Sequence, residues 1–132
     1  MSTTSNRATL MHLLDSNWHQ ESTIHSQLRS KLRYLILSPD CIEGSSFLSV
    51  REISAACEVS LSTVAKVISE LINCRVLTKS RGNATRVARG AKSLIVSEET
   101  THIYKTEMPS IMSRVEKLGS NKSEFLDTIL AQ

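Results

Sequence analysis

The basic side chains of this 132-residue chain are concentrated in one short stretch. Residues 61–92 carry seven lysines and arginines against a single acidic residue, Glu70, so this stretch sums to +6. The residues before it sum to −1 and those after it to −2, which accounts for the net charge of +3. A local positive field of this kind attracts the phosphate backbone of a nucleic acid, although a solvated basic face without a ligand is an equal alternative on charge alone. The seven basic residues are Lys66, Arg75, Lys79, Arg81, Arg86, Arg89 and Lys92.

Other reactive residue types occur without the spacing that catalysis or metal binding needs. The three cysteines (Cys41, Cys57 and Cys74) form no CxxC pair and have no histidine at metal-ligand spacing, so we expect reduced, mostly buried thiols. The four histidines form no close pair, and there is no nucleophile elbow, glycine-rich phosphate loop or HExxH motif. The sequence therefore predicts no enzyme activity, no metal site and no cofactor.

The composition predicts a soluble globular protein with a helical core. Apolar residues make up 40% of the chain and charged residues 22%, while aromatic residues make up only 4%. The core must then consist mostly of aliphatic side chains, which suits helices packed on one another. No apolar run approaches the roughly 20 residues that span a bilayer, and the N-terminus lacks a signal-peptide pattern. We therefore expect a cytoplasmic protein.

Two helices are predicted in the first part of the chain. The first covers residues 8–18, with Leu10, Leu13 and Leu14 on one side. The second begins after a cap at Ser22 or Thr23 and ends before Pro39, which cannot continue a helix. Its expected apolar stripe is Ile24, Leu28, Leu32 and Leu35, with Arg29, Lys31 and Arg33 on its other sides.

The next two predicted helices have the arrangement of a helix-turn-helix. Ser49 and Glu52 form a capping box before a helix over residues 50–57, and Ser60 caps a helix from residue 61 to about residue 74. Only three residues connect them. The buried stripe of the second helix is Val64, Val67, Ile68 and Leu71. Its opposite face carries small or basic residues that would allow close approach to a DNA major groove: Ser62, Ala65, Lys66 and Ser69.

A basic β-hairpin is predicted directly behind this helix. Residues 76–78 and 85–87 are β-type runs, and the turn over residues 79–83 is basic with Gly-Asn at its tip. Such a hairpin is a wing, and wings place arginine and lysine along the DNA backbone or minor groove. The predicted fold class is therefore mainly α with a small β-hairpin (α+β), a winged helix-turn-helix plus a C-terminal helical appendage.

Two short amphipathic helices are predicted in the tail. One starts near Pro109 and ends at Gly119, with the apolar stripe Met108, Ile111, Met112, Val115 and Leu118. Asn121 and Glu124 form a capping box for the last helix, which carries Phe125, Leu126, Ile129 and Leu130. The tail could fold back on the domain or pair with a second copy, and we favour pairing. Residues 93–106 have no clear assignment.

Specific motifs then indicate a family. The stretch from residue 24 to residue 87 resembles the DNA-binding domain of GntR-family transcription regulators. The run Ser49-Val50-Arg51-Glu52-Ile53-Ser54 is similar to the family's SxRELA helix, and Val59-Ser60-Leu61-Ser62-Thr63-Val64 to its VSxxTV turn. Residues 63–66 and the tail run 117–124 resemble the small YtrA-type branch, which lacks a large effector-binding domain.

The resemblance implies roles in DNA binding for ten residues. Arg51 would reach DNA from the first helix of the motif, and hydroxyls at the start of the second helix would contact phosphates. Lys66 would contact a phosphate or a base edge. Each could instead have a plain role: Arg51 could pair with Glu52 or Glu58, and Ser60 could only cap. The ten residues are Ser49, Arg51, Ser60, Ser62, Thr63 and Lys66, with Arg81, Gly82, Asn83 and Thr85 of the wing. Arg86 and Arg89 could extend the basic surface or face solvent.

The sequence departs from the family pattern at several turn positions. The family's turn glycine is Glu58 here, and the glycine before the first wing strand is Arg75. The second wing glycine is Ala84, and the proline before the first helix of the motif is Leu48. The lost glycines should strain those turns that need a positive φ.

Together these patterns predict three segments and one leading function. Residues 1–22 are a partly helical extension, 23–90 the winged helix-turn-helix domain and 91–132 a dimerisation appendage. The leading function is a sequence-specific, dimeric transcription regulator, a repressor that binds double-stranded DNA at a near-palindromic operator. The alternative is a winged-helix protein-interaction module, an adaptor in a replication or partition complex. A metabolite sensor would need a pocket of several hundred Å³, for which so short a tail would require a dimer interface.

Overall fold

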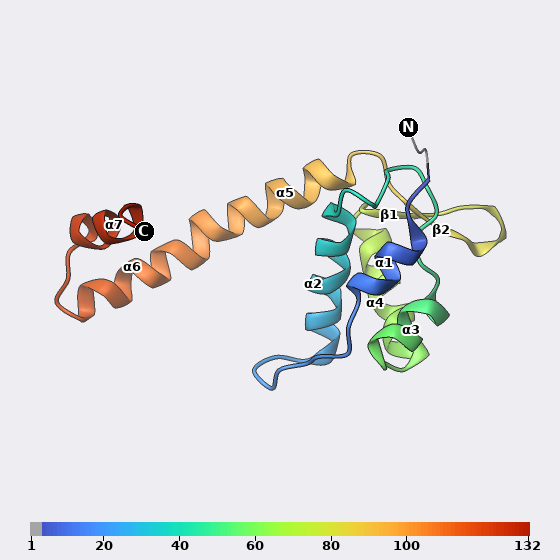
Figure 1. The fold of residues 1–132 in the computed structure, drawn as a ribbon, viewed down its shortest axis with the longest axis horizontal. Helices are drawn as coiled ribbons and strands as arrows, with labels where there is room; N and C mark the ends of the chain where they lie inside the picture. The colour runs from blue at the N-terminus through green and yellow to red at the C-terminus, as the bar shows by residue number, and fades with distance from the viewer. Residues whose placement is uncertain (1–3) are drawn as a thin grey trace. The chain divides into compact units, whose positions relative to one another are not determined.

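The computed structural model describes residues 4–132, which form two compact units that divide after residue 95 (Figure 1). This part of the chain is mostly helical with one two-stranded antiparallel sheet, which confirms the predicted fold class. Within the described residues, no helix is both long and apolar enough to cross a membrane.

The first helix of the N-terminal unit, α1 (Arg7–Leu13), is shorter than the sequence predicts. The Oδ1 atom of Asn6 accepts the N–H of Thr9 and caps its start. The helix ends because Leu14 adopts an extended conformation with φ −81° and ψ 142°, so the prediction of helix to Trp18 is wrong. Leu10 and Leu14 are buried, whereas Leu13 is 53% exposed because the chain leaves the helix there.

Helix α2 (Ile24–Leu37) starts at the predicted cap, where the Thr23 hydroxyl accepts the N–H of Ser26. Leu28, Leu32 and Leu35 are buried as expected, but Ile24 is 46% exposed in the first turn. Arg33, which the sequence places away from the apolar stripe, is nevertheless buried, with only 7% of the residue exposed. Helix α2 has buried residues on several of its sides. A single apolar stripe therefore could not predict all of them.

Helices α3 (Val50–Cys57) and α4 (Leu61–Asn73) confirm the predicted pair. Both halves of the capping box between Ser49 and Glu52 are present, and Ser60 caps α4. Helix α4 packs against α3 and α2, as Figure 1 shows. Its buried residues are the predicted stripe, Val64, Val67, Ile68 and Leu71.

The hairpin consists of β1 (Leu77–Lys79) and β2 (Thr85–Val87), joined through a short 3₁₀ turn, η1 (Arg81–Asn83). The strands pair antiparallel with Leu77 opposite Val87. Gly82 has φ +79°, which glycine adopts readily. The segment 44–47 runs along the other edge of β2, where Phe47 N–H donates to the Thr85 carbonyl at 2.8 Å. The sequence analysis predicted only the two hairpin strands, and this additional pairing covers the free edge of β2.

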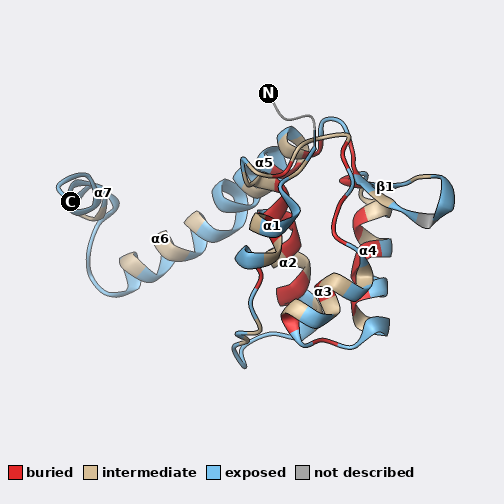
Figure 2. Ribbon diagram, turned by 45° about the vertical axis from the view of Figure 1, so that its right-hand side comes forward, coloured by how far each residue is buried: buried red, intermediate tan, exposed pale blue. Residues whose placement is uncertain are grey.

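The buried residues lie in the N-terminal unit (Figure 2). This core is almost entirely aliphatic, as the composition predicts. Among the described buried residues, Phe47 is the one aromatic side chain. Cys41 and Cys57 are buried free thiols, and burial raises the pKa of both. Cys74 is a half-buried free thiol, so the cysteines are mostly buried, as expected.

Helix α5 (Ala91–His102) starts in the N-terminal unit, where Ala91 and Ile95 are buried. The second unit contains the rest of α5, a π-helical segment η2 (Ile103–Glu107), α6 (Met108–Lys117) and α7 (Lys122–Leu130). Helix therefore covers most of the unassigned stretch 93–106. The predicted end of α6 near Gly119, which has φ +88°, is confirmed. At the start of α7 one half of the predicted capping box is present, because Asn121 Oδ1 accepts the N–H of Glu124 at 2.8 Å, whereas the Glu124 side chain does not return a bond to Asn121.

Candidate nucleic-acid interface

Three hydroxyl side chains gather at the N-terminus of α4. The Ser60 hydroxyl accepts the N–H of Thr63 at 3.3 Å and donates to the Thr63 hydroxyl at 2.9 Å. The hydroxyl of Ser62 lies 3.3 Å from that of Ser60. The first turn contains no acidic residue, so its N–H groups and the helix dipole present a positive end. Ser60 thus caps the helix, and the group as a whole has the chemistry to hold a phosphate.

The outward face of α4 carries small side chains and one cation. Ser62, Ala65, Lys66 and Ser69 are all exposed, on the side away from the buried stripe (Figure 2). The acidic residue of this helix, Glu70, is directed to α2, with its Oε2 atom 2.8 Å from Nε2 of His25. Close approach of a polyanion along this face therefore meets Lys66 without an opposing carboxylate from the same face.

The N-terminus of α3 holds the other two predicted residues of the helix pair. Ser49 and Arg51 are exposed, and the Ser49 hydroxyl accepts the N–H of Glu52 at 3.1 Å. The Glu52 carboxylate accepts the Ser49 N–H at 2.9 Å and forms an ion pair with Arg7. Arg7 is thus a part of this end of α3 that sequence reasoning missed. Arg7 and Glu52 are 45 residues apart, and no local pattern signals such a pair.

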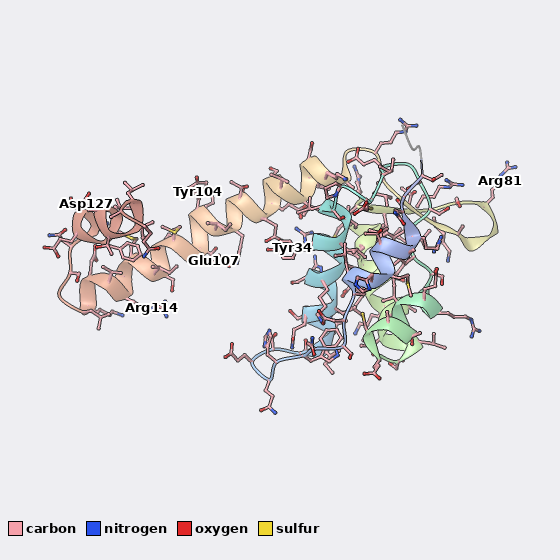
Figure 3. All side chains as sticks on the ribbon, viewed as in Figure 1. Tyr34, Arg81, Tyr104, Glu107, Arg114 and Asp127 are labelled. Carbon is pink, nitrogen blue, oxygen red and sulfur yellow. The ribbon has the colours of Figure 1, made fainter. Side chains whose placement is uncertain are left out.

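The wing presents the remaining predicted residues. Arg81 is exposed, and Figure 3 shows its side chain extending from the hairpin turn. Gly82 is exposed and Thr85 half-buried, while the side chain of Asn83 lies outside the described part. Arg86 does not extend freely, because its Nη1 donates to the Gly44 carbonyl at 3.1 Å. Six predicted residues therefore lie on the packed α3–α4 pair and four on the wing of the same unit.

Two of the three positions that lack a family glycine keep the backbone that glycine favours, whereas Ala84 is extended with φ −69°. Glu58 has φ 54° and Arg75 has φ 65°, the two positive values outside glycine among the described residues. Glu58 ends α3 in the left-handed conformation and leads into the turn before α4. The expected backbone strain thus lies on both sides of α4, at Glu58 before the helix and at Arg75 after it.

A groove of about 530 Å³ lies beside α2 in the same unit. None of the ten predicted DNA contacts lines it. Its walls come from one face of α2 and from the segment that returns from α1, including Leu13, Lys31 and Tyr34. The groove therefore shares no residue with the proposed DNA-binding surface of α3 and α4.

Comparison with known proteins identifies similar folds. No family model matches this sequence, and no curated protein matches it. Among solved structures, a GntR family transcriptional regulator from Listeria monocytogenes is 21% identical with a TM-score of 0.70, covering 87% of this chain and 99% of that one. A protein from Bacteroides thetaiotaomicron assigned to the GntR family is 27% identical with a TM-score of 0.70, covering 83% and 95%.

A transcriptional regulator from Oenococcus oeni is 20% identical with a TM-score of 0.68, covering 87% of this chain and 93% of that one. The three neighbours match over nearly their whole length, so the likeness extends beyond the winged helix itself. The chain therefore has the fold of solved bacterial transcriptional regulators, two of which carry the GntR family name.

Proposed function

We propose that this protein is a sequence-specific DNA-binding transcription regulator of the GntR family. The observation that carries the proposal is the outward face of α4, where three hydroxyls at the helix start are followed by Lys66 and no acidic side chain. In a winged helix this helix enters the major groove, its first turn holds a phosphate, and the wing follows the backbone. The ten residues predicted from the sequence are the proposed contacts.

The C-terminal unit supports a homodimer. All of residues 96–132 are described, and none of them is buried. Ile129 is 43% exposed, Leu126 46% and Leu118 85%, although these are apolar side chains on short helices. A unit of this size cannot stabilise itself without burying such groups, and oligomerisation is a usual solution. We propose that residues 91–132 pair with a second copy, as in the YtrA-type branch.

A two-fold dimer reads two half-sites of a near-palindrome, separated by one or more helical turns of DNA. Occupancy of such a site beside a promoter blocks polymerase, so we propose a repressor that acts in the cytoplasm. The protein then needs no cofactor of its own to bind DNA. The YtrA-type assignment rests on residues 63–66 and on the tail run 117–124.

Selection and sequencing of fragmented host DNA bound by the purified full chain tests this proposal. At near-physiological salt, we expect enrichment of one near-palindromic site. Because phosphate contacts dominate non-specific binding, the selection must be repeated at two salt concentrations. Binding without any enriched site would refute a sequence-specific regulator and favour the alternative, a winged-helix module that binds protein. Early elution from a heparin column would point the same way.

A further inference from the structure

The segment before α2 is held firmly on the N-terminal unit from residue 5 onward. The Ser5 hydroxyl accepts the N–H of Ile42 at 2.9 Å and shares a hydrogen bond with the hydroxyl of Ser45. The N–H of Asn6 donates to the Asp40 carbonyl at 2.9 Å. Only 1% of Leu10 is exposed, so the turn that follows is anchored in the core. These contacts fix the position of the residue between them, Arg7.

Arg7 is directed to the capping box that starts α3. Its Nη1 atom forms an ion pair with Oε1 of Glu52, and its Nη2 atom donates to the Phe47 carbonyl at 3.4 Å. The same Oε1 atom of Glu52 accepts the N–H of Ser49 at 2.9 Å. One carboxylate oxygen therefore joins the N-terminal segment to the first turn of α3.

The position of this pair has an electrostatic consequence at the proposed DNA interface. Glu52 adjoins Arg51 and caps through Ser49, both of which are proposed contacts. An unpaired carboxylate at that end would repel phosphates, whereas the Arg7 guanidinium neutralises it. Side-chain exposure of 47% for Arg7 and 31% for Glu52 leaves the pair at the surface, where its charges act on an approaching polyanion.

We propose that Arg7 is a positioning residue for DNA binding. It acts through Glu52, by cancelling the charge of that carboxylate beside Ser49 and Arg51. The N-terminal segment is then a working part of the DNA-binding module instead of a passive extension. This inference rests on the proposed function, since it needs DNA at the N-terminus of α3.

A double-mutant cycle tests the inference. Glutamine at position 52 removes the charge and still accepts the Ser49 N–H, because a capping box works with either residue. We expect Arg7→Gln to lower affinity for the enriched duplex about fivefold, and Arg7→Gln with Glu52→Gln to return to within about twofold of wild type. Arg7→Lys, which keeps the charge, should bind nearly as wild type. Lys31→Gln is the matched control, because Lys31 forms an ion pair with Asp15 in the same unit and is not among the ten proposed DNA contacts.

The possible outcomes distinguish failure of this inference from failure of the proposed DNA-binding function. Wild-type protein that binds no DNA would overturn both. Wild-type binding with an unaffected Arg7→Gln variant, or a loss that persists in full in the Glu52→Gln background, would overturn only the role of Arg7. The salt dependence of the double variant gives an independent readout: action through Glu52 returns the slope to that of the wild type, because the pair then again carries no net charge, whereas a direct phosphate contact of Arg7 would leave the slope lower by about one. A slope that stays lowered in the double variant would therefore also overturn the positioning role.

Discussion

Glu58→Gly should stabilise the N-terminal unit, because Glu58 ends α3 with φ 54° and ψ 47°. A side chain with a Cβ in the left-handed region costs about 1–2 kcal/mol, whereas glycine loses about 0.5–1 kcal/mol more conformational entropy on folding. The midpoints of these two ranges favour glycine by about 0.75 kcal/mol. For a unit of this size the unfolding midpoint should then rise by about 2–8 °C. The exposed position of Glu58 means that no core packing is lost.

The matched control for this change is Glu58→Ala. Alanine removes the same carboxylate but keeps the Cβ, so its stability should stay within about 0.5 kcal/mol of wild type. Thermal and urea unfolding can be followed by the fluorescence of Trp18, the single tryptophan, which lies under Lys31 with its ring centroid 4.0 Å from Nζ. If the glycine variant is no more stable than the alanine variant, the left-handed turn is not strained and the reasoning fails.

Three other changes probe the interface, the start of α5 and the tail. Lys66→Ala should weaken operator binding about tenfold and flatten its salt dependence in a mobility-shift titration, and unchanged binding would place DNA elsewhere than on α4. N–H groups of Lys92 and Gly90 donate to the Glu43 carboxylate and hold its pKa below the usual 4.5. This contact contributes its full stability above pH 4.5 and loses it as the pH falls through the lower pKa that Glu43 has in the folded protein. Glu43→Gln should therefore lose less unfolding free energy than wild type between pH 7 and pH 3. Equal losses in the two proteins would contradict this. Ile129→Asp should convert a dimer to a monomer in sedimentation velocity, and an unchanged mass would exclude this part of the tail as the dimer interface.

Local signals predicted the parts of the fold that local chemistry determines. The boundaries of α3 are correct because Ser49 and Glu52 satisfy each other's backbone across a single turn. The stripe of α4 is correct because this helix buries one face only, so its spacing is read directly from the sequence. Two of the three missing glycines mark a positive φ, at Glu58 and Arg75, but the third does not, because Ala84 has φ −69°.

Most of the failures have a different cause, which is contact between distant segments. Helix α1 stops at Leu13, where Leu14 becomes buried, and the Asp15 carboxylate then accepts the N–H of Asn17 at 3.0 Å, an Asx turn that the apolar spacing did not reveal. Arg33 is buried although an arginine on a polar side normally indicates solvent. The pairing of segment 44–47 with β2, and that of Arg7 with Glu52, joins residues about 40 positions apart.

Helix α5 explains why the tail was the least predictable part and what that implies. Of its twelve residues only Ala91 and Ile95 are buried, so the apolar period vanishes after one turn. Val96 at 52% exposed and Tyr104 at 71% are apolar or aromatic residues without cover in one chain. The spacing of apolar residues along a helix reflects which of its faces are packed. A face that packs only against a second copy is exposed in a single chain. If the tail dimerises as proposed, these side chains become protected, and hydrogen exchange of residues 96–107 should slow as protein concentration rises. Exchange that is independent of concentration would leave these residues without a partner.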